Sequence, residues 1–223
     1  MIKIAGFQKN SFIDYPGKIA SVIFLGGCNF VCHYCHNSNI LSNESNTKDF
    51  NEVLVELKEQ TGFIDGVVIT GGEPTLHPHL KEIIREIKAL GFLVKLDTNG
   101  TNHEILKHLD VDFIAMDIKA PLEKYPLITS CNPDNILESI NFLKQGKTDY
   151  MFRTTLSPLL TESDIKQIGK LIDGAKCFQL QQLIPNDFSN SHNTVHVPYP
   201  PATAKKFGAL LSKHCERLVM RGF

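Results

Sequence analysis

The chain has 223 residues, 42% of them hydrophobic, and its 23 Lys and Arg against 24 Asp and Glu give a formal net charge of −1. This balance, without a run of basic residues, excludes nucleic-acid or membrane-surface binding that depends on bulk electrostatics. Since no apolar stretch approaches the roughly 20 residues that cross a bilayer and residues 1–17 show no signal-peptide pattern, we expect a cytoplasmic protein with no membrane and no nucleic-acid partner.

Short apolar runs alternate with amphipathic stretches along the whole chain. The runs are rich in β-branched and aromatic residues, and several are almost continuously apolar, as in strands that are covered on both faces. Six of them are predicted to be strands: residues 19–25, 66–70, 92–97, 112–118, 150–156 and 177–183.

Helical patterns occupy the intervals between these runs. They are predicted at residues 47–62, 77–91, 102–109, 132–146, 161–175 and 201–216. In the first helix, Thr47 is the expected N-cap and Gly62 the expected stop. In the second, five apolar residues share one face and belong to the core: Leu80, Ile83, Ile84, Ile87 and Leu90. After the last helix, residues 217–223 are consistent with a closing edge strand.

Six repeated strand–helix units predict an α/β fold with a mainly parallel sheet and right-handed crossovers. Six units are too few for a closed eight-stranded barrel, so we expect an open partial (β/α)6 barrel, with a flat doubly wound sheet as the alternative. The predicted organisation is one domain over residues 1–223. It comprises a core at about 18–185, a surface loop at 186–200, and a C-terminal helix and edge strand at 201–223.

Three cysteines follow the first predicted strand in "GGCNFVCHYCHN", with a C-x3-C-x2-C spacing: Cys28, Cys32 and Cys35. In a reducing compartment such cysteines indicate metal binding or catalysis before disulfides. A closed zinc site takes four ligands, and His33 or His36 is the available fourth. An iron–sulfur cubane held by three thiolates would instead leave one iron open, and we favour this interpretation over a zinc-binding module. The three isolated cysteines, Cys131, Cys177 and Cys215, are expected to be small buried residues.

At this point the sequence resembles a known superfamily. "CNFVCHYCHN", with Tyr34 before the third cysteine, is similar to the radical S-adenosylmethionine (SAM) signature, and "TGGEPTL" at 70–76 is similar to its Gly-Gly-Glu motif. Further stretches from Phe12 to Arg221 resemble anaerobic ribonucleotide reductase activating proteins and, more loosely, formate-lyase-type activases. They include "FIDYPGK", "FLVKLDTNGT", "AMDIKAPLEKYP", "FRTTLSP" and "LQQL". No additional cysteine-rich insert follows the core motif.

The resemblance implies a partial barrel of radical SAM type, with a [4Fe–4S] cluster on the three cysteines and SAM on the open iron. An electron from the cluster, supplied by a flavodoxin- or ferredoxin-type donor, would cleave SAM to methionine and a 5′-deoxyadenosyl radical. That radical would take a hydrogen from a backbone glycine of a partner glycyl-radical enzyme, an anaerobic ribonucleoside-triphosphate reductase. The alternatives are activation of another glycyl-radical enzyme, or radical chemistry on a small molecule, as in the deazaguanine synthases.

The resemblance also implies a set of SAM-binding residues at successive strand ends: Tyr34, Gly71, Gly72, Glu73, Asp97, Asn99, Asp117, Lys119 and Arg153. The physical reasons differ along the set. The two glycines allow the backbone to approach a ligand closely, and Glu73 provides charge for an ammonium group; a tight turn before Pro74 is the alternative. Around Asn99, "DTNG" also fits a simple Asx-type turn.

The resemblance also implies roles for the charged residues near SAM. Lys119 and Arg153 are the candidates for the SAM carboxylate. Because an unpaired charge in an apolar strand is costly, Arg153 either pairs with an aspartate or points at the ligand. Oxygen atoms of Asp14, Asp97, Thr98 and Asp117 are expected near the SAM amino end, around a monovalent cation. Formate-lyase-type activases have a SAM-contacting histidine where this chain has Asp187, so no contact is assigned there.

Overall fold

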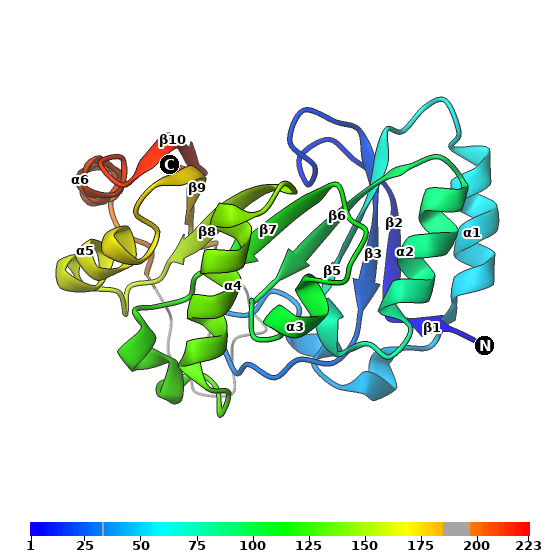
Figure 1. The fold of residues 1–223 in the computed structure, drawn as a ribbon, viewed down its shortest axis with the longest axis horizontal. Helices are drawn as coiled ribbons and strands as arrows, with labels where there is room; N and C mark the ends of the chain where they lie inside the picture. The colour runs from blue at the N-terminus through cyan, green and yellow to red at the C-terminus, as the bar shows by residue number, and fades with distance from the viewer. Residues whose placement is uncertain (33, 185–196) are drawn as a thin grey trace. The chain divides into compact units, whose positions relative to one another are not determined.

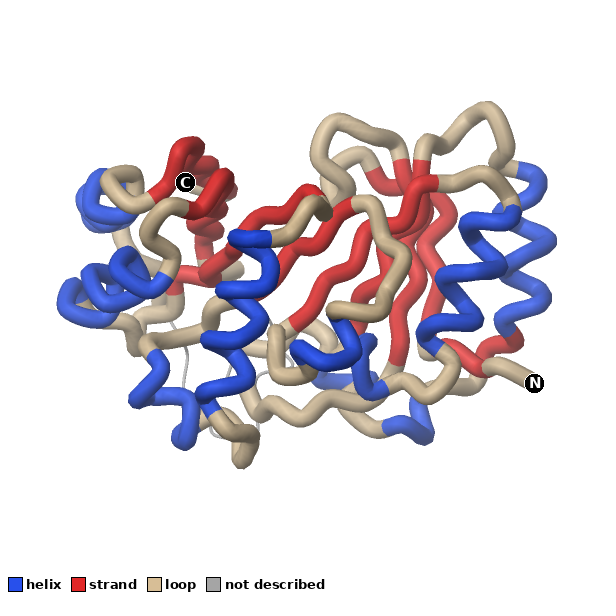
Figure 2. The backbone as a smooth tube through the Cα atoms, viewed as in Figure 1, coloured by secondary structure: helices blue, strands red, loops and turns tan. Residues whose placement is uncertain are grey.

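The structure is a computed structural model that describes residues 1–32, 34–184 and 197–223 (Figures 1 and 2). Most of the loop predicted at 186–200, including Asp187, lies outside the described residues, as does His33. The chain divides into two compact units: residues 1–29, 39–98 and 104–114 form the first, and residues 30–38, 99–103 and 115–223 the second. The prediction of one domain over residues 1–223 stays a prediction.

The first unit contains a sheet whose strands follow the order β2 (Gly6–Ser11), β3 (Ala20–Leu25), β5 (Gly66–Gly71) and β6 (Leu93–Thr98). β3, β5 and β6 are parallel, and Gly66 lies opposite both Ala20 and Leu93. The strands therefore start level, and their carboxyl ends lie at the same edge of the sheet. β2 pairs with β3 in the antiparallel direction, with a register shift between Gln8 and Ser11.

The helices of this part of the chain are α1 (Phe50–Glu59), α2 (Leu80–Ala89) and the short α3 (His103–Leu106), with 3-10 turns η1 (Ser38–Ile40), η2 (Asn43–Ser45) and η3 (Pro74–Leu76). The predicted apolar stripe of α2 is buried at Leu80, Ile83, Ile84 and Ile87. The predicted N-cap of α1, Thr47, is wrong, whereas the helix ends at Glu59, shortly before the expected stop at Gly62. Asp49 is its N-cap, accepting from Asn51 N, because Lys48–Asp49 forms the short strand β4 against β1 (Lys3–Ile4).

Strand β7 (Phe113–Asp117) begins in the first unit and ends in the second. In the second unit, β8 (Asp149–Leu156), β9 (Ala175–Gln182) and β10 (Cys215–Arg221) follow one another and are parallel. Its helices are η4 (Leu122–Leu127), α4 (Pro133–Gln145), α5 (Glu162–Leu171) and α6 (Pro201–Leu211). Figure 1 shows α5 and α6 beside each other near β9 and β10.

One carboxylate links α5 to η4 within the second unit. Thr161 and Asp164 form a capping box at the start of α5, in which Asp164 Oδ2 accepts from Thr161 N at 2.8 Å. The same oxygen accepts from Lys124 Nζ of η4 at 2.7 Å. The start of α5 and the middle of η4 therefore share a single charged acceptor.

The predicted α/β fold with mainly parallel strands is confirmed, since all six predicted strands occur within a few residues of their predicted limits. The predicted edge strand is present as β10. The helix predicted to reach residue 216 ends at Leu211, because Cys215 already begins that strand. β1, β2 and β4 were not predicted. Among the described residues, no helix is both long and apolar enough to cross a membrane.

Candidate active site

The carboxyl end of β5 lies against the main chain that leads to Cys28. Gly72 N donates to Leu25 O at 2.9 Å, and Glu73 N donates to Gly27 O at 2.8 Å. A Cβ atom on Gly72 would lie 2.0 Å from Gly27 O, far closer than real contacts allow. Gly71 has φ +123° and meets Leu25 O in the same way, at 2.3 Å. Both glycines are therefore required by the approach of two backbones, a reason that is independent of any ligand.

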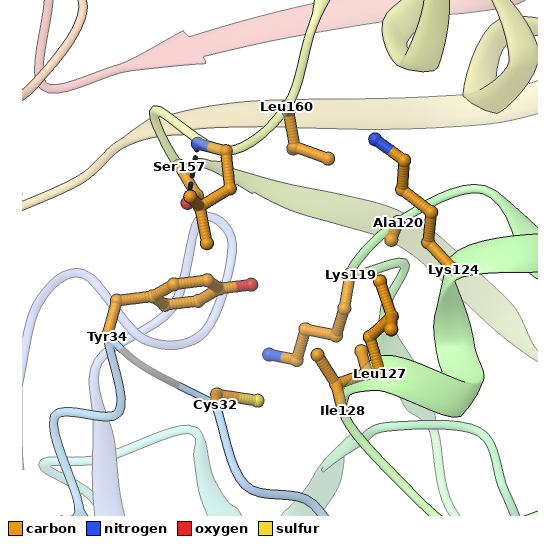
Figure 3. A pocket seen from close by; sticks show the side chains of 10 residues that line it. Cys32, Tyr34, Lys119, Ala120, Lys124, Leu127, Ile128, Ser157 and Leu160 are labelled. Atoms are coloured by element: carbon orange, nitrogen blue, oxygen red, sulfur yellow. Dashed lines mark hydrogen bonds between the residues drawn. The ribbon is translucent and has the colours of Figure 1, made fainter. Parts of the chain in front are cut away.

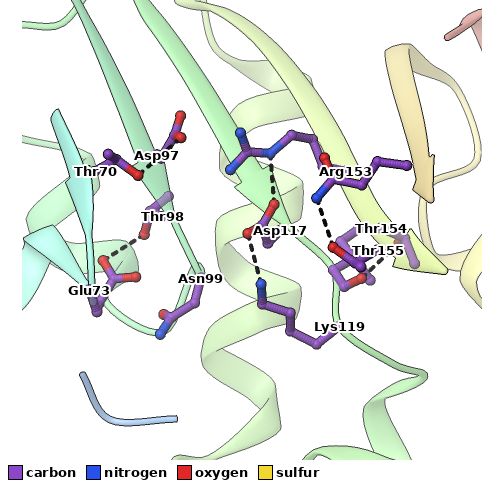
Figure 4. Close-up of polar contacts among 12 residues, drawn as sticks. Thr70, Glu73, Asp97, Thr98, Asn99, Asp117, Lys119, Arg153, Thr154 and Thr155 are labelled. Atoms are coloured by element: carbon purple, nitrogen blue, oxygen red, sulfur yellow. Dashed lines mark hydrogen bonds and ion pairs between the residues drawn. The ribbon is translucent and has the colours of Figure 1, made fainter. Parts of the chain in front are cut away.

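Glu73 is anchored at this edge of the first unit. Its side chain is only 1% exposed. Oε1 accepts hydrogen bonds from Thr75 N at 3.0 Å and from Thr75 Oγ1 at 2.6 Å. It also accepts one from Thr98 Oγ1 at 2.8 Å (Figure 4). The carboxylate thus caps η3 and at the same time ties the end of β5 to the end of β6.

Asp97 lies at the same edge, at the end of β6. Its carboxylate accepts from Thr70 Oγ1 at 3.2 Å (Figure 4). It also pairs with Lys95 Nζ. Lys95 is 2% exposed and lies two residues earlier on the same strand. Sequence reasoning missed Lys95, although a lysine inside the apolar run "FLVKLD" was a signal that a buried partner of opposite charge must exist.

Asp14 is not brought together with Asp97, contrary to expectation. It lies before β3, in the loop at the starting edge of the first-unit sheet, and accepts a hydrogen bond from Ser11 Oγ at 2.6 Å. Since β3, β5 and β6 start level, Asp14 is a full strand length from the edge that carries Asp97. The "FIDYPG" segment is therefore remote from the strand ends that carry Glu73 and Asp97.

In the second unit, two cations converge on Asp117 at the end of β7. Lys119 Nζ donates to Asp117 Oδ2 at 2.8 Å, and Arg153 Nε donates to Oδ1 at 2.7 Å (Figure 4). Of the two alternatives for Arg153, the structure has the pair with an aspartate. Burial raises the pKa of Asp117, but the adjacent Arg153 and Lys119 outweigh burial and hold the pKa well below its usual range.

Lys119 is charged for the complementary reason. Burial lowers the pKa of its ammonium group, but the negative charge of Asp117 outweighs this and raises the pKa well above the usual value. Asp117, Lys119 and Arg153 therefore form a charged group of one anion and two cations. Their side chains are 22%, 16% and 14% exposed, so solvent screens the group only weakly.

Lys119 also lines a cavity of about 300 Å³ beside the cysteine loop (Figure 3). Cys32 and Tyr34 also line this space, with the end of the Lys119 side chain pointing toward Cys32, and the remaining lining is mainly apolar: Ala120, Leu127, Ile128, Leu159 and Leu160, with Lys124 and Ser157. Burial raises the pKa of the Cys32 thiol, and Lys119 opposes that rise. Burial likewise raises the pKa of the Tyr34 phenol. A cavity with one charged end and apolar walls suits an amphipathic small molecule.

Asn99 forms the turn that the sequence offered as the alternative to ligand binding. Its Oδ1 accepts from Thr101 N at 3.0 Å and from Thr101 Oγ1 at 2.7 Å, and the residue is 6% exposed. The amide oxygen therefore stabilises an Asx-type turn.

Comparison with known proteins gives these features a context. A profile of the radical SAM superfamily matches residues 22–172. The chain belongs to this superfamily. It is 33% identical to a Methanocaldococcus jannaschii protein named "putative glycyl-radical enzyme activating enzyme", over 98% of this chain and 95% of the relative. It is 28% identical to the pyruvate formate-lyase-activating enzyme of Clostridium pasteurianum, over 83% of this chain and 82% of the relative.

Solved structures agree on the fold of this radical SAM enzyme. Streptococcus suis SuiB bound to its precursor peptide SuiA superimposes with a TM-score of 0.69 at 14% sequence identity, over 90% of this chain and 48% of that one. The chain therefore spans about half the length of SuiB. As a member of the superfamily, the enzyme uses a [4Fe–4S] cluster and SAM as cofactors.

The cysteines of the radical SAM enzyme can be tested against the cluster by their chemistry. Cys28, Cys32 and Cys35 are reduced cysteines, each partly exposed, and Cys35 N donates to Cys32 O at 3.2 Å. Three thiolates suit a cluster with one open iron better than a closed zinc site. Within the described ranges, no three His, Cys, Asp or Glu side chains gather closely enough to hold a metal ion. The assignment therefore rests on the donor set and stays a prediction.

The other three cysteines differ in burial. Cys177 is buried, as expected, and accepts a hydrogen bond from Arg217. Cys131 and Cys215 are only partly buried, so the expectation is wrong for these two. Cys177 is therefore the natural control in experiments on the cysteine loop.

Proposed function

We propose that this radical SAM enzyme generates a glycyl radical on a partner protein, and that the partner is an anaerobic ribonucleoside-triphosphate reductase. The observation that carries the proposal is the similarity to the "putative glycyl-radical enzyme activating enzyme" of Methanocaldococcus jannaschii over almost the full length of both chains. The reductase is favoured among the possible partners by the stretches "LDTNG" and "MDIKAPLEKYP". A flavodoxin- or ferredoxin-type protein is the proposed electron donor.

In this proposal the thiolates of Cys28, Cys32 and Cys35 hold the cluster and leave one iron for SAM. When bound, the cluster and SAM supply the electron and the carbon radical needed to take a hydrogen atom from a glycine Cα. The chain itself binds and orients SAM and keeps water away from the reacting atoms.

The proposed SAM-binding groups divide by charge. Glu73, with the strand-end carbonyls of Gly71 and Gly72, receives the ammonium group. Lys119 receives the carboxylate: its ammonium has three N–H donors, of which Asp117 takes one, and it lines the cavity beside Cys32. Arg153 contributes positive charge next to it. Tyr34 lines the same cavity and offers an aromatic face and a hydroxyl to the rest of SAM.

The remaining proposed ligands also have partners of their own within the protein. Asn99 would bind SAM at the cost of its turn. A monovalent cation at Asp97 and Asp117 would share these carboxylates with Lys95, Lys119 and Arg153. The proposal therefore ranks the cation and Asn99 below Lys119 as determinants of SAM affinity.

The partner is tested by supplying candidate substrates to the reconstituted, reduced enzyme with SAM. We expect a glycyl-radical electron paramagnetic resonance signal and stoichiometric 5′-deoxyadenosine only when the anaerobic reductase is added. If the radical formed on a formate-lyase-type enzyme and not on the reductase, the proposed partner would be wrong but the proposed activase function would stand. Turnover of a deazaguanine precursor, with no radical on either protein, would overturn the activase.

The cluster site is tested separately, by anaerobic reconstitution with iron and sulfide. Cys32→Ala should abolish the cluster signal with and without SAM, whereas Cys177→Ala should leave it intact. An unchanged signal in the first variant, or a colourless protein that carries zinc, would remove the three thiols from the proposed site.

A further inference from the structure

Tyr125 connects the cysteine loop to the end of β7 within the second unit. The residue lies in η4 and is 0% exposed. Its ring packs edge-on against Phe30, with centroids 5.9 Å apart and planes at 75°. Its hydroxyl oxygen accepts the main-chain N–H of Lys119 at 3.1 Å. One buried side chain therefore touches both the segment between the first two cysteines and the lysine that lines the cavity.

The main chain repeats this connection. Val31 N, next to Cys32, donates to Ile128 O at 3.0 Å, and Ile128 N donates to Tyr125 O at 2.9 Å. The turn after η4 thus holds the cysteine loop by a backbone hydrogen bond, while the Tyr125 ring holds it at Phe30. These two contacts, at successive residues of the cysteine loop, restrict both the distance of the loop from η4 and its orientation relative to η4.

The end of β7 is fixed at each successive backbone group. Ile118 N donates to Arg153 O at 2.7 Å, and Ile118 O accepts from Thr154 Oγ1 at 2.7 Å. Lys119 N is the next group, and its acceptor is the Tyr125 hydroxyl. Since a backbone N–H in a partly buried position requires an acceptor, loss of this hydroxyl would release Lys119 from its fixed position.

We infer that Tyr125 is a positioning residue that sets the distance between the cysteine loop and the Lys119 ammonium group. SAM, whose sulfonium must meet the cluster while its carboxylate meets a cation, needs these two groups at a fixed separation. The inference rests on the proposed roles of the three cysteines and Lys119. It assigns no contact between Tyr125 and SAM.

The chain provides a matched control in Tyr150. That residue is 4% exposed, and its hydroxyl accepts the main-chain N–H of Lys176 at 3.2 Å, the same kind of bond in another part of the second unit. Tyr125→Phe and Tyr150→Phe each remove one such bond and keep the ring. Both variants lose a buried phenol hydrogen bond. A difference in SAM affinity between them therefore reports on the location of Tyr125 and not on that general loss.

The test measures SAM dissociation constants by anaerobic equilibrium dialysis, together with iron and sulfide per chain and apoprotein thermal unfolding. We expect Tyr125→Phe to retain the cluster but to bind SAM roughly tenfold more weakly, as loss of one such hydrogen bond allows. Tyr150→Phe should bind SAM as the unmodified enzyme does, with a similar decrease in unfolding temperature. Equal SAM affinities in the two variants would overturn the inference.

Phe30→Leu tests the contact between the Phe30 and Tyr125 rings. It also tests the positioning role of Tyr125 if Tyr125→Phe fails to fold. It removes the ring that meets Tyr125 but keeps the hydroxyl bond to Lys119. We expect a several-fold faster loss of iron to a chelator; an unchanged rate would contradict a positioning role. If Cys32→Ala retains its cluster, the site assignment fails, and that result is distinguishable from a failure of Tyr125 alone.

Discussion

Glu73 in the first unit and Asp117 in the second are both carboxylates at the carboxyl end of a strand, but they are held in different ways. Glu73 Oε1 accepts from one amide and two hydroxyl groups, which are neutral donors that orient the carboxylate. Asp117 accepts from two cationic side chains, Lys119 and Arg153. The contacts described for Glu73 come from neutral donors and those for Asp117 from charged donors, so the two carboxylates should respond differently to the loss of their charge.

The position of Glu73 depends on the close backbone approach at Gly72. The largest expected change in the free energy of unfolding comes from a substitution at this glycine. Gly72→Ala would place a Cβ atom 2.0 Å from Gly27 O, and backbone atoms cannot move aside easily. We expect the free energy of unfolding, measured by chemical denaturation, to fall by more than about 4 kcal/mol. Gly91→Ala is the control: it has φ +89° but no atom within 4 Å of the new Cβ, and should cost only about 1–2 kcal/mol.

Removing the charge of each carboxylate in turn should separate the two anchors. Asp117→Asn leaves two partly buried cations without their anion, and should lower the free energy of unfolding by about 3–5 kcal/mol. Glu73→Gln keeps an oxygen acceptor for its neutral donors, and should cost about 1–2 kcal/mol. Urea denaturation of the apoproteins measures both, and equal costs would show that the two carboxylates are held alike.

A smaller difference in the free energy of unfolding is expected between two threonine hydroxyl bonds, one to the Glu73 carboxylate and one to the neutral Asn99 amide. Thr98→Val removes the bond to the carboxylate, and Thr101→Val removes the 2.7 Å bond to the Asn99 amide oxygen. Because hydrogen bonds to charged groups are stronger, we expect costs of about 2 and about 1 kcal/mol respectively. A larger loss for Thr101→Val in denaturant titrations would mean that Glu73 does not depend on Thr98.

The smallest expected effect is a pH dependence at the N-terminal strand of the first unit. His77 Nε2 lies 3.1 Å from Lys3 O, and His79 N donates to His77 Nδ1 at 3.3 Å, so a neutral ring protonated on Nε2 satisfies both contacts. Burial lowers the pKa of His77, the hydrogen bond to Lys3 opposes this, and the neighbouring His79 lowers it further. Its stabilising contribution is therefore fully present above the unfolded pKa of about 6.5 and is lost as the pH falls through the folded pKa.

Thermal unfolding at about pH 7.5 and 5.5 checks this dependence. We expect His77→Gln to reduce the loss of unfolding temperature on acidification, and the exposed His108→Gln to serve as its control. A loss of the same size in the unmodified chain and in His77→Gln would assign the pH dependence to other groups.

Much of the fold could be predicted because the strands of this chain are apolar and β-branched, and their limits follow from composition. β2 was missed for a physical reason: Gln8, Lys9 and Asn10 are consecutive, polar and exposed, so the segment has no alternation to detect. It is extended because it pairs with β3, which is a tertiary effect. Likewise, Thr47 is as good an N-cap as Asp49 by residue type, and only the pairing of β4 with β1 decides between them.

The site was predictable where a single residue carried its own physical requirement. The cost of a buried charge predicted that Arg153 either pairs with an aspartate or points at the ligand, and the same argument applied to Lys95 would have found its pair with Asp97. Tyr125 gave no such signal, since its contacts lie 95 and 6 residues away in sequence, at Phe30 and Lys119. The tight approach at Gly72 is also a property of two backbones, and "TGGEP" alone indicates only a turn.

Asp164 has a consequence for how the second unit opens. Because a single oxygen serves both the capping box of α5 and Lys124 of η4, unwinding the first turn of α5 also withdraws the acceptor from the residue beside Tyr125. Amide protons of the two segments should then exchange with solvent through one shared fluctuation, with a common protection energy. Local unfolding at the start of α5 would in this way be coupled to the conformational stability of the cysteine loop.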